Sequence, residues 1–231
     1  MKLLLDTANI EDIRYISTYF PIVGVTTNPT ILSREGGDPA ARLREIRKTI
    51  GDDKQLHVQV TETEYDKIMA EAHTIVGALG KNTYVKIPIT DVGLWATREL
   101  TAMGYHVTIT AILSAGQALL AANAGAAYVA PYVSRLENIC ENGVESVAEI
   151  QQVFDAAGCS TKILAASFKT AREVIDVALT GAATATVSAE VMRKLLTHTT
   201  TDTSIAGFAA DWEKAFGKSK LGNMLESGGK K

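Results

Sequence analysis

Residues 83–110 read TYVKIPITDVGLWATRELTAMGYHVTIT and contain the pattern that decides the fold. A short apolar run, Thr83–Ile87, is followed by a segment of helical period, Gly93–Met103, and then by a second apolar run, His106–Thr110. Gly104 stands where the helical segment ends, and glycine there can adopt the left-handed cap conformation without a steric penalty. The stretch therefore predicts two parallel strands joined by a helix that covers them.

The same unit recurs along the chain. Strands are predicted at Lys2–Asp6, Ile22–Thr26, Gln55–Val60, Thr83–Ile87, His106–Thr110, Ala127–Pro131, Thr161–Ala165 and Ala183–Val187. Helices are predicted at Ile10–Thr18, Ala40–Ile50, Tyr65–Leu79, Gly93–Met103, Ser114–Asn123, Gly143–Ala157, Thr170–Leu179 and Ala189–Thr197. Glycines follow six of these helices: Gly51, Gly80, Gly104, Gly125, Gly158 and Gly181.

Eight such units predict an α/β protein with a closed (β/α)8, or TIM, barrel. The alternative is a doubly wound open sheet, whose nucleotide-binding form has a glycine-rich turn after the first strand. This chain has Asp-Thr-Ala-Asn at that place, starting at Asp6, so the barrel is favoured.

Composition restricts the classes of function. The 231 residues, 46% of them hydrophobic, fit one barrel, and the formal net charge of −3 gives no basic surface for nucleic acid. The sequence has no apolar run long enough to cross a membrane and no signal-peptide core, so we expect a cytoplasmic protein without a membrane partner. Cys140 and Cys159 are predicted to be separate reduced thiols.

The C-terminal part exceeds a minimal barrel. A further helix is predicted at Ser204–Phe216, and the tail 226–231 is expected to be disordered, with residues 1–231 forming one domain. Apolar residues of this helix share one face, which packs either on its own barrel or on a neighbouring subunit. These residues are Ile205, Phe208, Ala209, Trp212 and Phe216.

Lys86 is the most informative polar residue. It alternates with Val85 and Ile87 along a strand, so it points into the barrel if those two pack under the helices. It lies near the carboxyl end of the strand, where the active sites of such barrels are found. Burial lowers the pKa of a lysine and makes a neutral amine available to attack a carbonyl. The alternative is a core lysine held in a salt bridge.

Other polar residues recur at the same end of other strands. Each taken singly has a structural explanation, since Asp6 or Asn28 can cap a helix and Thr110 favours a strand. Their recurrence at one end indicates a functional site. The residues are Asp6, Thr26, Asn28, Gln59, Thr110, Tyr132 and Ser167.

Two cations follow late strands, Arg135 after the sixth and Lys169 after the seventh. Late loops commonly bind phosphate in these barrels, so a phosphorylated substrate is expected unless both are ordinary surface charges. Two of the four histidines, His57 and His106, lie at strand beginnings, and the other two lie in helices. No metal-ligand spacing is present, so catalysis without a metal or another cofactor is expected.

These residues lie in segments that resemble the transaldolase and fructose-6-phosphate aldolase family. The segments are LLLDTAN from Leu3, GVTTNPTIL from Gly24, VKIP from Val85, YVAPYVSR from Tyr128 and LAASFKT from Leu164. With DWEKAFG from Asp211, the resemblance covers nearly the whole chain.

The resemblance implies a role for each matching residue. Lys86 matches the lysine that forms the Schiff base, and Asp6 matches the acid that assists proton transfer and positions substrate hydroxyls. The other matches are Asn28 and Ser167 with donors to the dihydroxyacetone unit, Thr110 and Gln59 with partners of a catalytic water, and Arg135 and Lys169 with phosphate-binding cations. The resemblance also implies ring-based homo-oligomers, such as a decamer, with C-terminal helices that cross between subunits.

Two activities compete within the family. Gln59, Ala130 and Tyr132 resemble the aldolase subgroup, whereas transaldolases have glutamate, serine and phenylalanine there. The expected reaction is therefore the reversible cleavage of fructose 6-phosphate to dihydroxyacetone and glyceraldehyde 3-phosphate. The alternatives are a transaldolase, which transfers the dihydroxyacetone unit between sugar phosphates, and a barrel that binds sugar phosphate without chemistry.

Overall fold

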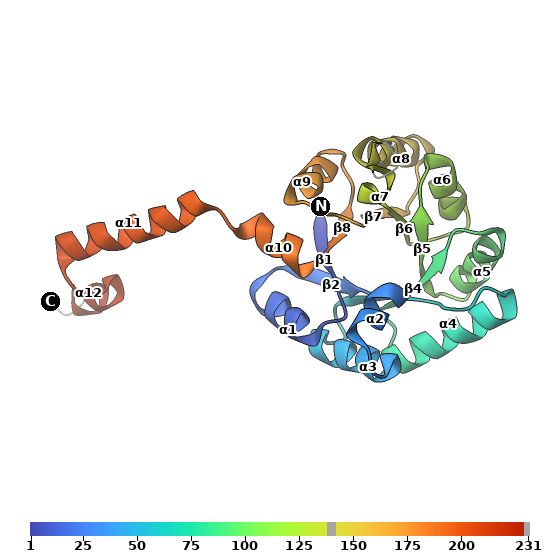
Figure 1. Ribbon diagram of the computed structural model, residues 1–231, viewed down its shortest axis with the longest axis horizontal. Coiled ribbons are helices and arrows are strands. Elements are labelled where there is room, and N and C mark those ends of the chain that lie inside the picture. The colour runs from blue at the N-terminus through green and yellow to red at the C-terminus, as the bar shows by residue number, and fades with distance from the viewer. Residues whose placement is uncertain (138–141, 229–231) are drawn as a thin grey trace. The chain divides into compact units, whose positions relative to one another are not determined.

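The computed structural model describes residues 1–137 and 142–228 and confirms the predicted (β/α)8 barrel. Its eight strands are all parallel and close into a ring in sequence order, from β1 to β8. Figure 1 looks along this ring and shows the helices around it. Cys140 and residues 229–231 lie outside the described residues, while Cys159 is a free, half-buried thiol.

The strands are short. They are β1 Lys2–Asp6, β2 Ile22–Thr26, β3 Gln55–Gln59, β4 Thr83–Pro88, β5 His106–Ile112, β6 Tyr128–Pro131, β7 Lys162–Ala165 and β8 Thr184–Val187. The helices of the barrel are α1 Ile10–Tyr19, α2 Pro29–Glu35, α3 Pro39–Ile50, α4 Tyr65–Leu79, α5 Asp91–Ala102, α6 Ala115–Asn123, α7 Val133–Glu137, α8 Gly143–Ala157, α9 Ala171–Leu179 and α10 Ala189–Leu196.

The two faces of the strands have different environments. Outward residues such as Val85 and Ile87 pack with helix residues such as Ala96 and Leu100 in the main core. Inside the ring, a smaller apolar cluster contains Leu4, Tyr128 and Leu164. Next to it lies the fully buried His57, which stacks on Tyr84 with ring centroids 4.5 Å apart. The ring interior is thus a packed core, and Lys86 shares its inward direction with Tyr84.

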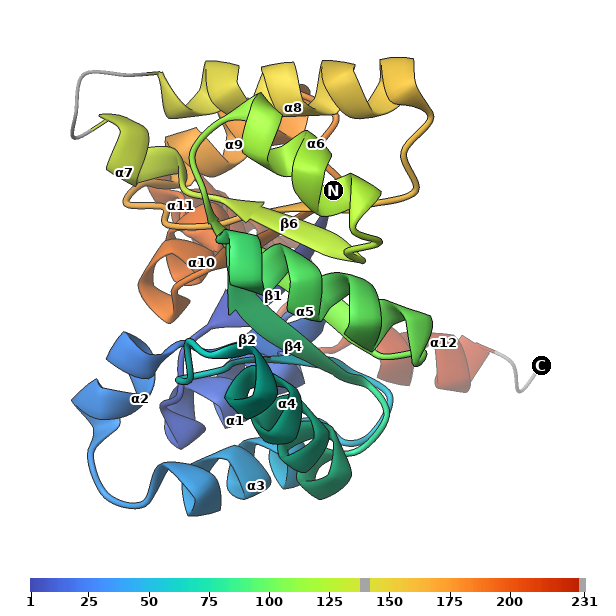
Figure 2. The same ribbon diagram turned by 90° about the vertical axis from the view of Figure 1, so that its right-hand side faces the viewer.

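The glycines that were expected to end helices all have positive φ, for example 85° at Gly104 and 89° at Gly181. Two helices of the barrel were not predicted. α2 and α7 have only seven and five residues, too few to show a helical period. Each follows the carboxyl end of a strand, and Figure 2 shows both at the same end of the barrel.

The described residues form two compact units, residues 1–192 and the part of the chain that begins at Arg193. The expectation that residues 1–231 form one domain stays a prediction. The second unit contains α11, Thr199–Phe216, and α12, Leu221–Gly228. α11 begins five residues before the predicted start because His198 caps it, with Nδ1 accepting from the amide of Thr200 at 3.2 Å. α12 was not predicted, and it includes residues 226–228 of the tail that was expected to be disordered.

None of the described helices has both the length and the apolar character required to cross a membrane.

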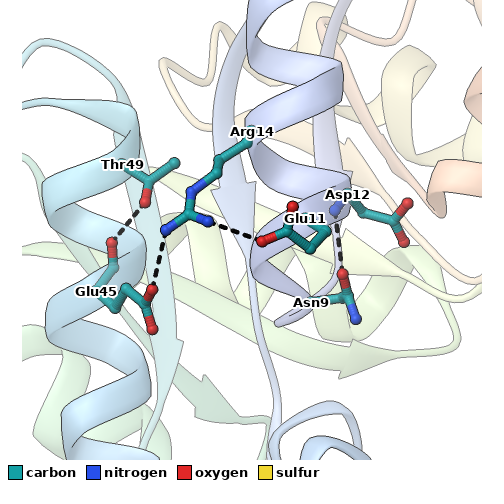
Figure 3. A network of polar contacts seen from close by, with 6 residues as sticks. All are labelled: Asn9, Glu11, Asp12, Arg14, Glu45 and Thr49. Atoms are coloured by element: carbon teal, nitrogen blue, oxygen red, sulfur yellow. Dashed lines mark hydrogen bonds and ion pairs between the residues drawn. The ribbon is translucent and has the colours of Figure 1, made fainter.

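The first helices of the barrel are joined by a small polar network, drawn in Figure 3. The guanidinium of Arg14 in α1 contacts Glu11 at 2.7 Å and Glu45 of α3 at 3.2 Å. Asn9 caps α1 through a bond of 3.0 Å from the amide of Asp12. Because the ion pairs are exposed, we expect them to add little stability and the buried core to dominate.

Two glycines provide a matched test of packing behind β4. A Cβ on Gly93, in the first turn of α5, would collide with the carbonyl oxygen of Pro88, whereas a Cβ on Gly77 in α4 would meet nothing within 4 Å. We expect Gly93→Ala to lower the free energy of unfolding by about 1–3 kcal/mol through overpacking. Gly77→Ala should raise it by about 0.5–1 kcal/mol, because alanine has the higher helix propensity. Urea unfolding followed by circular dichroism measures both, and equal effects would contradict this account of the packing.

Candidate functional site

Lys86 lies inside the barrel, with only 6% of its surface exposed. In the sheet it is in register with Gln59 of β3 and Thr108 of β5. Its Nζ donates a hydrogen bond of 2.8 Å to the carbonyl oxygen of Thr27. Burial lowers the pKa of the amine, and the Asp6 carboxylate partly offsets this effect. Lys86 is therefore placed to supply a neutral amine.

Asp6 ends β1 and belongs to a chain of hydroxyl contacts. The Thr26 hydroxyl donates to Asp6 Oδ1 at 2.6 Å and also lies 2.7 Å from the hydroxyl of Thr186 in β8. Since Thr26 has one proton to donate, Thr186 is the donor in the second contact. Burial raises the pKa of Asp6, against the opposing effects of Lys86 and of the Thr26 hydrogen bond. The pKa values of the acid and the amine thus shift toward each other, which favours proton transfer at neutral pH.

A cavity of about 430 Å³ brings most of the predicted site residues together. Of the ten, eight line it: Asp6, Asn28, Gln59, Lys86, Thr110, Tyr132, Arg135 and Ser167. Thr26 is not a lining residue but supports Asp6 from behind. Lys169 is also absent from the lining. It is exposed, and its amide donates to Glu173 at 2.7 Å. Of the two predicted phosphate-binding cations, only Arg135 is therefore among the residues that line the cavity.

A strand irregularity brings Thr110 and Tyr132 together. Ala111 has φ of 62°, and the pairing of β5 with β6 shifts by one residue between Thr110 and Ile112. The hydroxyls of Thr110 and Tyr132 lie 3.4 Å apart. The guanidinium of Arg135 lies over the Tyr132 ring, 4.3 Å from its centroid, in a cation–π contact that orients both side chains. A phenol, a hydroxyl and a cation therefore share one wall.

Asn28 both caps a helix and lines the cavity. Its Oδ1 accepts from the amide of Ile31 at 2.9 Å, so its NH₂ group remains as a donor toward the cavity. Ser167 has φ of 66°, which is uncommon for a residue other than glycine, and its carbonyl accepts from the amide of Ser134 at 2.9 Å. Such conformations concentrate at functional sites, where the surrounding structure holds them.

Three polar residues that line the cavity were not predicted as site residues: Thr30, Arg34 and Thr186. The first two lie on α2, which the sequence pattern did not reveal. The reasoning that identified Lys86 could also have identified Thr186, because Thr186 is a polar residue near the carboxyl end of an apolar strand. In the parts of the chain that the structure describes, no histidine, cysteine, aspartate and glutamate side chains form a group of three or more suited to a metal ion. The expectation of metal-free catalysis stays a prediction.

The comparisons with known proteins agree with the sequence resemblance. Residues 3–224 match the family model described as transaldolase/fructose-6-phosphate aldolase. A probable transaldolase of Symbiobacterium thermophilum is 39% identical over 218 residues, which cover 94% of this chain and 100% of the relative. A probable transaldolase of Lactiplantibacillus plantarum is 41% identical over 216 residues, covering 94% and 98%.

A more distant likeness concerns the fold alone. The structure of a thiamine phosphate pyrophosphorylase from Pyrococcus furiosus superposes with a TM-score of 0.57 at 17% identity. The match covers 83% of this chain and 87% of that one.

The electrostatic coupling of Asp6 to Lys86 can be measured through imine formation. With dihydroxyacetone and a borohydride quench, we expect the rate of adduct formation to rise with pH through the pKa of Lys86, at a midpoint below the ordinary 10.5. The Asp6 carboxylate raises that pKa, so Asp6→Asn should move the midpoint to lower pH. Intact-mass spectrometry measures the adduct, and Lys86→Ala should remove it.

Asp66→Asn, an exposed change on α4, is the matched control and should keep the midpoint of the unmodified protein. A midpoint that stays the same or rises in Asp6→Asn would contradict the coupling.

Proposed function

Because the chain belongs to the transaldolase/fructose-6-phosphate aldolase family, we propose that it is a class I aldolase that reversibly cleaves fructose 6-phosphate to dihydroxyacetone and glyceraldehyde 3-phosphate. The observation that carries the proposal is the position of Tyr132. Its hydroxyl lies 3.4 Å from that of Thr110, in the cavity that Lys86 lines. A tyrosine there provides a general acid and base toward the aldehyde product, which an enzyme that releases both products requires.

The reaction begins at Lys86. Its neutral amine attacks the C2 carbonyl carbon of the ketose, and Asp6 donates the proton with which the C2 oxygen leaves as water. The product is an iminium ion between Nζ and C2. This cation accepts the electron pair of the bond that breaks next, so the mechanism requires no metal or other cofactor.

Cleavage of the C3–C4 bond follows. Tyr132, with a water bound by Gln59 and Thr110, removes the proton of the C4 hydroxyl, and the electrons of the C3–C4 bond move to the iminium. Glyceraldehyde 3-phosphate leaves and an enamine remains on Lys86. Protonation of the enamine at C3 by the same group, followed by hydrolysis, releases dihydroxyacetone and restores the amine.

Other residues hold the substrate. We assign the hydroxyls of the dihydroxyacetone unit to the Asn28 amide and the Ser167 hydroxyl, both of which line the cavity. Arg135 binds the phosphate, and this remote binding energy orients the reacting carbon. Lys169 lies in the loop before α9, and its expected role at the phosphate stays a prediction.

A transaldolase is the second candidate, favoured by the names of the relatives, which are probable transaldolases at about 40% identity. Such an enzyme passes the enamine-bound unit to an acceptor aldehyde instead of releasing it. The two activities differ in whether turnover needs the acceptor, and this difference can be tested directly.

The decisive assay supplies fructose 6-phosphate alone and measures glyceraldehyde 3-phosphate. We expect steady release, and we expect Tyr132→Phe to lower it by about 10²–10⁴-fold, the usual contribution of a general acid–base group. Adduct formation at Lys86 should persist in this variant, and Tyr19→Phe, an exposed change in α1, should release product as the unmodified protein does. Release only after erythrose 4-phosphate is added would establish the transaldolase. No turnover in either assay would favour a barrel that only binds sugar phosphate.

We also propose that the protein is a ring-based homo-oligomer, through the second compact unit. Several large apolar side chains of this unit are exposed within the single chain, including Phe208 at 71% and Leu225 at 70%. Exposed apolar faces of this kind commonly mark subunit contacts. Light scattering is expected to give a multiple of the monomer mass, and Phe208→Glu should reduce that mass. A monomer in the unmodified protein would contradict the proposal.

A further inference from the structure

The helix α2 places a cation at the cavity that the sequence pattern did not reveal. Thr30, Ile31 and Arg34 all line the cavity. Positions 30 and 34, and likewise 31 and 34, are spaced so that their side chains share one face of a helix. Because the whole face lines the cavity, the presence of Arg34 there follows from the orientation of the helix.

Contacts at both ends fix that orientation. At the start, the Asn28 side chain accepts from the amide of Ile31 at 2.9 Å. At the end, the Asn9 side chain donates to Glu35 Oε2 at 3.2 Å, which ties the last residue of α2 to the beginning of α1. Glu35, the carboxylate next to Arg34 in sequence, is thus engaged with Asn9.

Arg34 and Arg135 reach the cavity from opposite walls. The strands close in sequence order, so β2 and β6 lie across the ring from each other. α2 follows β2 and α7, which contains Arg135, follows β6. Figure 2 shows the two helices at the same end of the barrel, on either side of it. Lys86, on β4, lies between these walls.

The charges of the lining leave an excess of positive charge. Its charged residues are Asp6, Lys86, Arg34 and Arg135, and the first two are electrostatic partners. Within residues 1–137 and 142–228, no carboxylate forms an ion pair with either guanidinium. Guanidinium groups have the donor geometry and the permanent charge that suit a phosphate dianion.

We propose that Arg34 is a specificity-determining residue, which binds the phosphate of the substrate from the wall opposite Arg135. A cavity of about 430 Å³ lies at the small end of ligand sites and holds one sugar phosphate, so both cations act on the same ligand. The inference rests on the proposed function for the identity of the ligand. Under this proposal the second phosphate-binding cation is Arg34 of α2, in place of Lys169, which the sequence had indicated.

The test runs the reaction in the direction of synthesis, with dihydroxyacetone as the donor. It compares two acceptors, glyceraldehyde 3-phosphate and glyceraldehyde. They form the same carbon–carbon bond and differ in the phosphate. For Arg34→Gln, we expect the ratio of their kcat/KM values to fall about ten- to a hundredfold, the usual effect of losing a hydrogen bond to a charged group. Arg34→Lys should restore part of the ratio, because it keeps the charge without the planar donor geometry.

Arg44→Gln is the matched control, since Arg44 is exposed on α3 and is not a lining residue. It should retain the original ratio. Equal losses for both acceptors in Arg34→Gln would indicate a structural role and overturn the proposal. The proposal would also be overturned if the ratio of the two kcat/KM values stayed the same in Arg34→Gln and fell in Arg135→Gln.

A measurement without turnover separates this inference from the proposed function. In a Lys86→Ala background, calorimetry gives the Kd of fructose 6-phosphate with and without Arg34→Gln. Weaker binding by ten- to a hundredfold would support the role of Arg34 even if the unmodified protein cleaved nothing. An unchanged Kd would overturn that role even if the aldolase activity were established.

Discussion

The amine of Lys86 is enclosed in a closed barrel, and a charged amine taken out of water is costly unless other groups compensate. Three features of the surroundings do so. The carbonyl of Thr27 accepts a hydrogen bond from Nζ, Asp6 provides a partly compensating negative charge, and His57 stays neutral. Burial, together with the nearby Lys86 and His106, holds the pKa of His57 well below its ordinary value. The part of the burial cost that these groups do not offset lowers the pKa of Lys86, and the neutral amine is the reactive form.

The site depends on closure of the whole ring. Asp6 comes from β1 and Thr186 from β8, and the hydroxyl of Thr26 from β2 joins them. Because β2 pairs with β1, the hydrogen bond from Thr26 to Asp6 joins neighbouring strands, whereas the contact of Thr186 with Thr26 requires β8 to close the ring against β1. Thr26 and Thr186 are 160 positions apart in sequence, so this chain of hydroxyl contacts is complete only when the last strand has docked. Closure of the barrel and completion of this polar chain are thus coupled.

Sequence reasoning succeeded where one physical rule dominates. Burial on both faces makes the strands apolar, so an inward lysine such as Lys86 stands out, and the helix-ending glycines mark the return to the next strand. It failed where a segment is too short for a period, which hid α2 and with it Arg34. Sequence reasoning also could not reveal the backbone conformation of single residues. Nothing in the identity of Ala111 or Ser167 indicates a positive φ, yet these conformations shape the walls of the cavity around Thr110 and Ser167.

For Lys169, the predicted role at the phosphate rests on its position in the sequence and stays a prediction. Its place after β7 is correct, but the loop is held by Glu173, which accepts from the amides of Lys169 and Thr170. The second guanidinium in the lining of the cavity is that of Arg34, on α2. Arg135 meanwhile contacts the ring of Tyr132, so the group assigned to the phosphate also orients the group assigned to proton transfer. With these assigned roles, substrate binding and chemistry share one contact. A change at Arg135 is therefore expected to affect KM and kcat together.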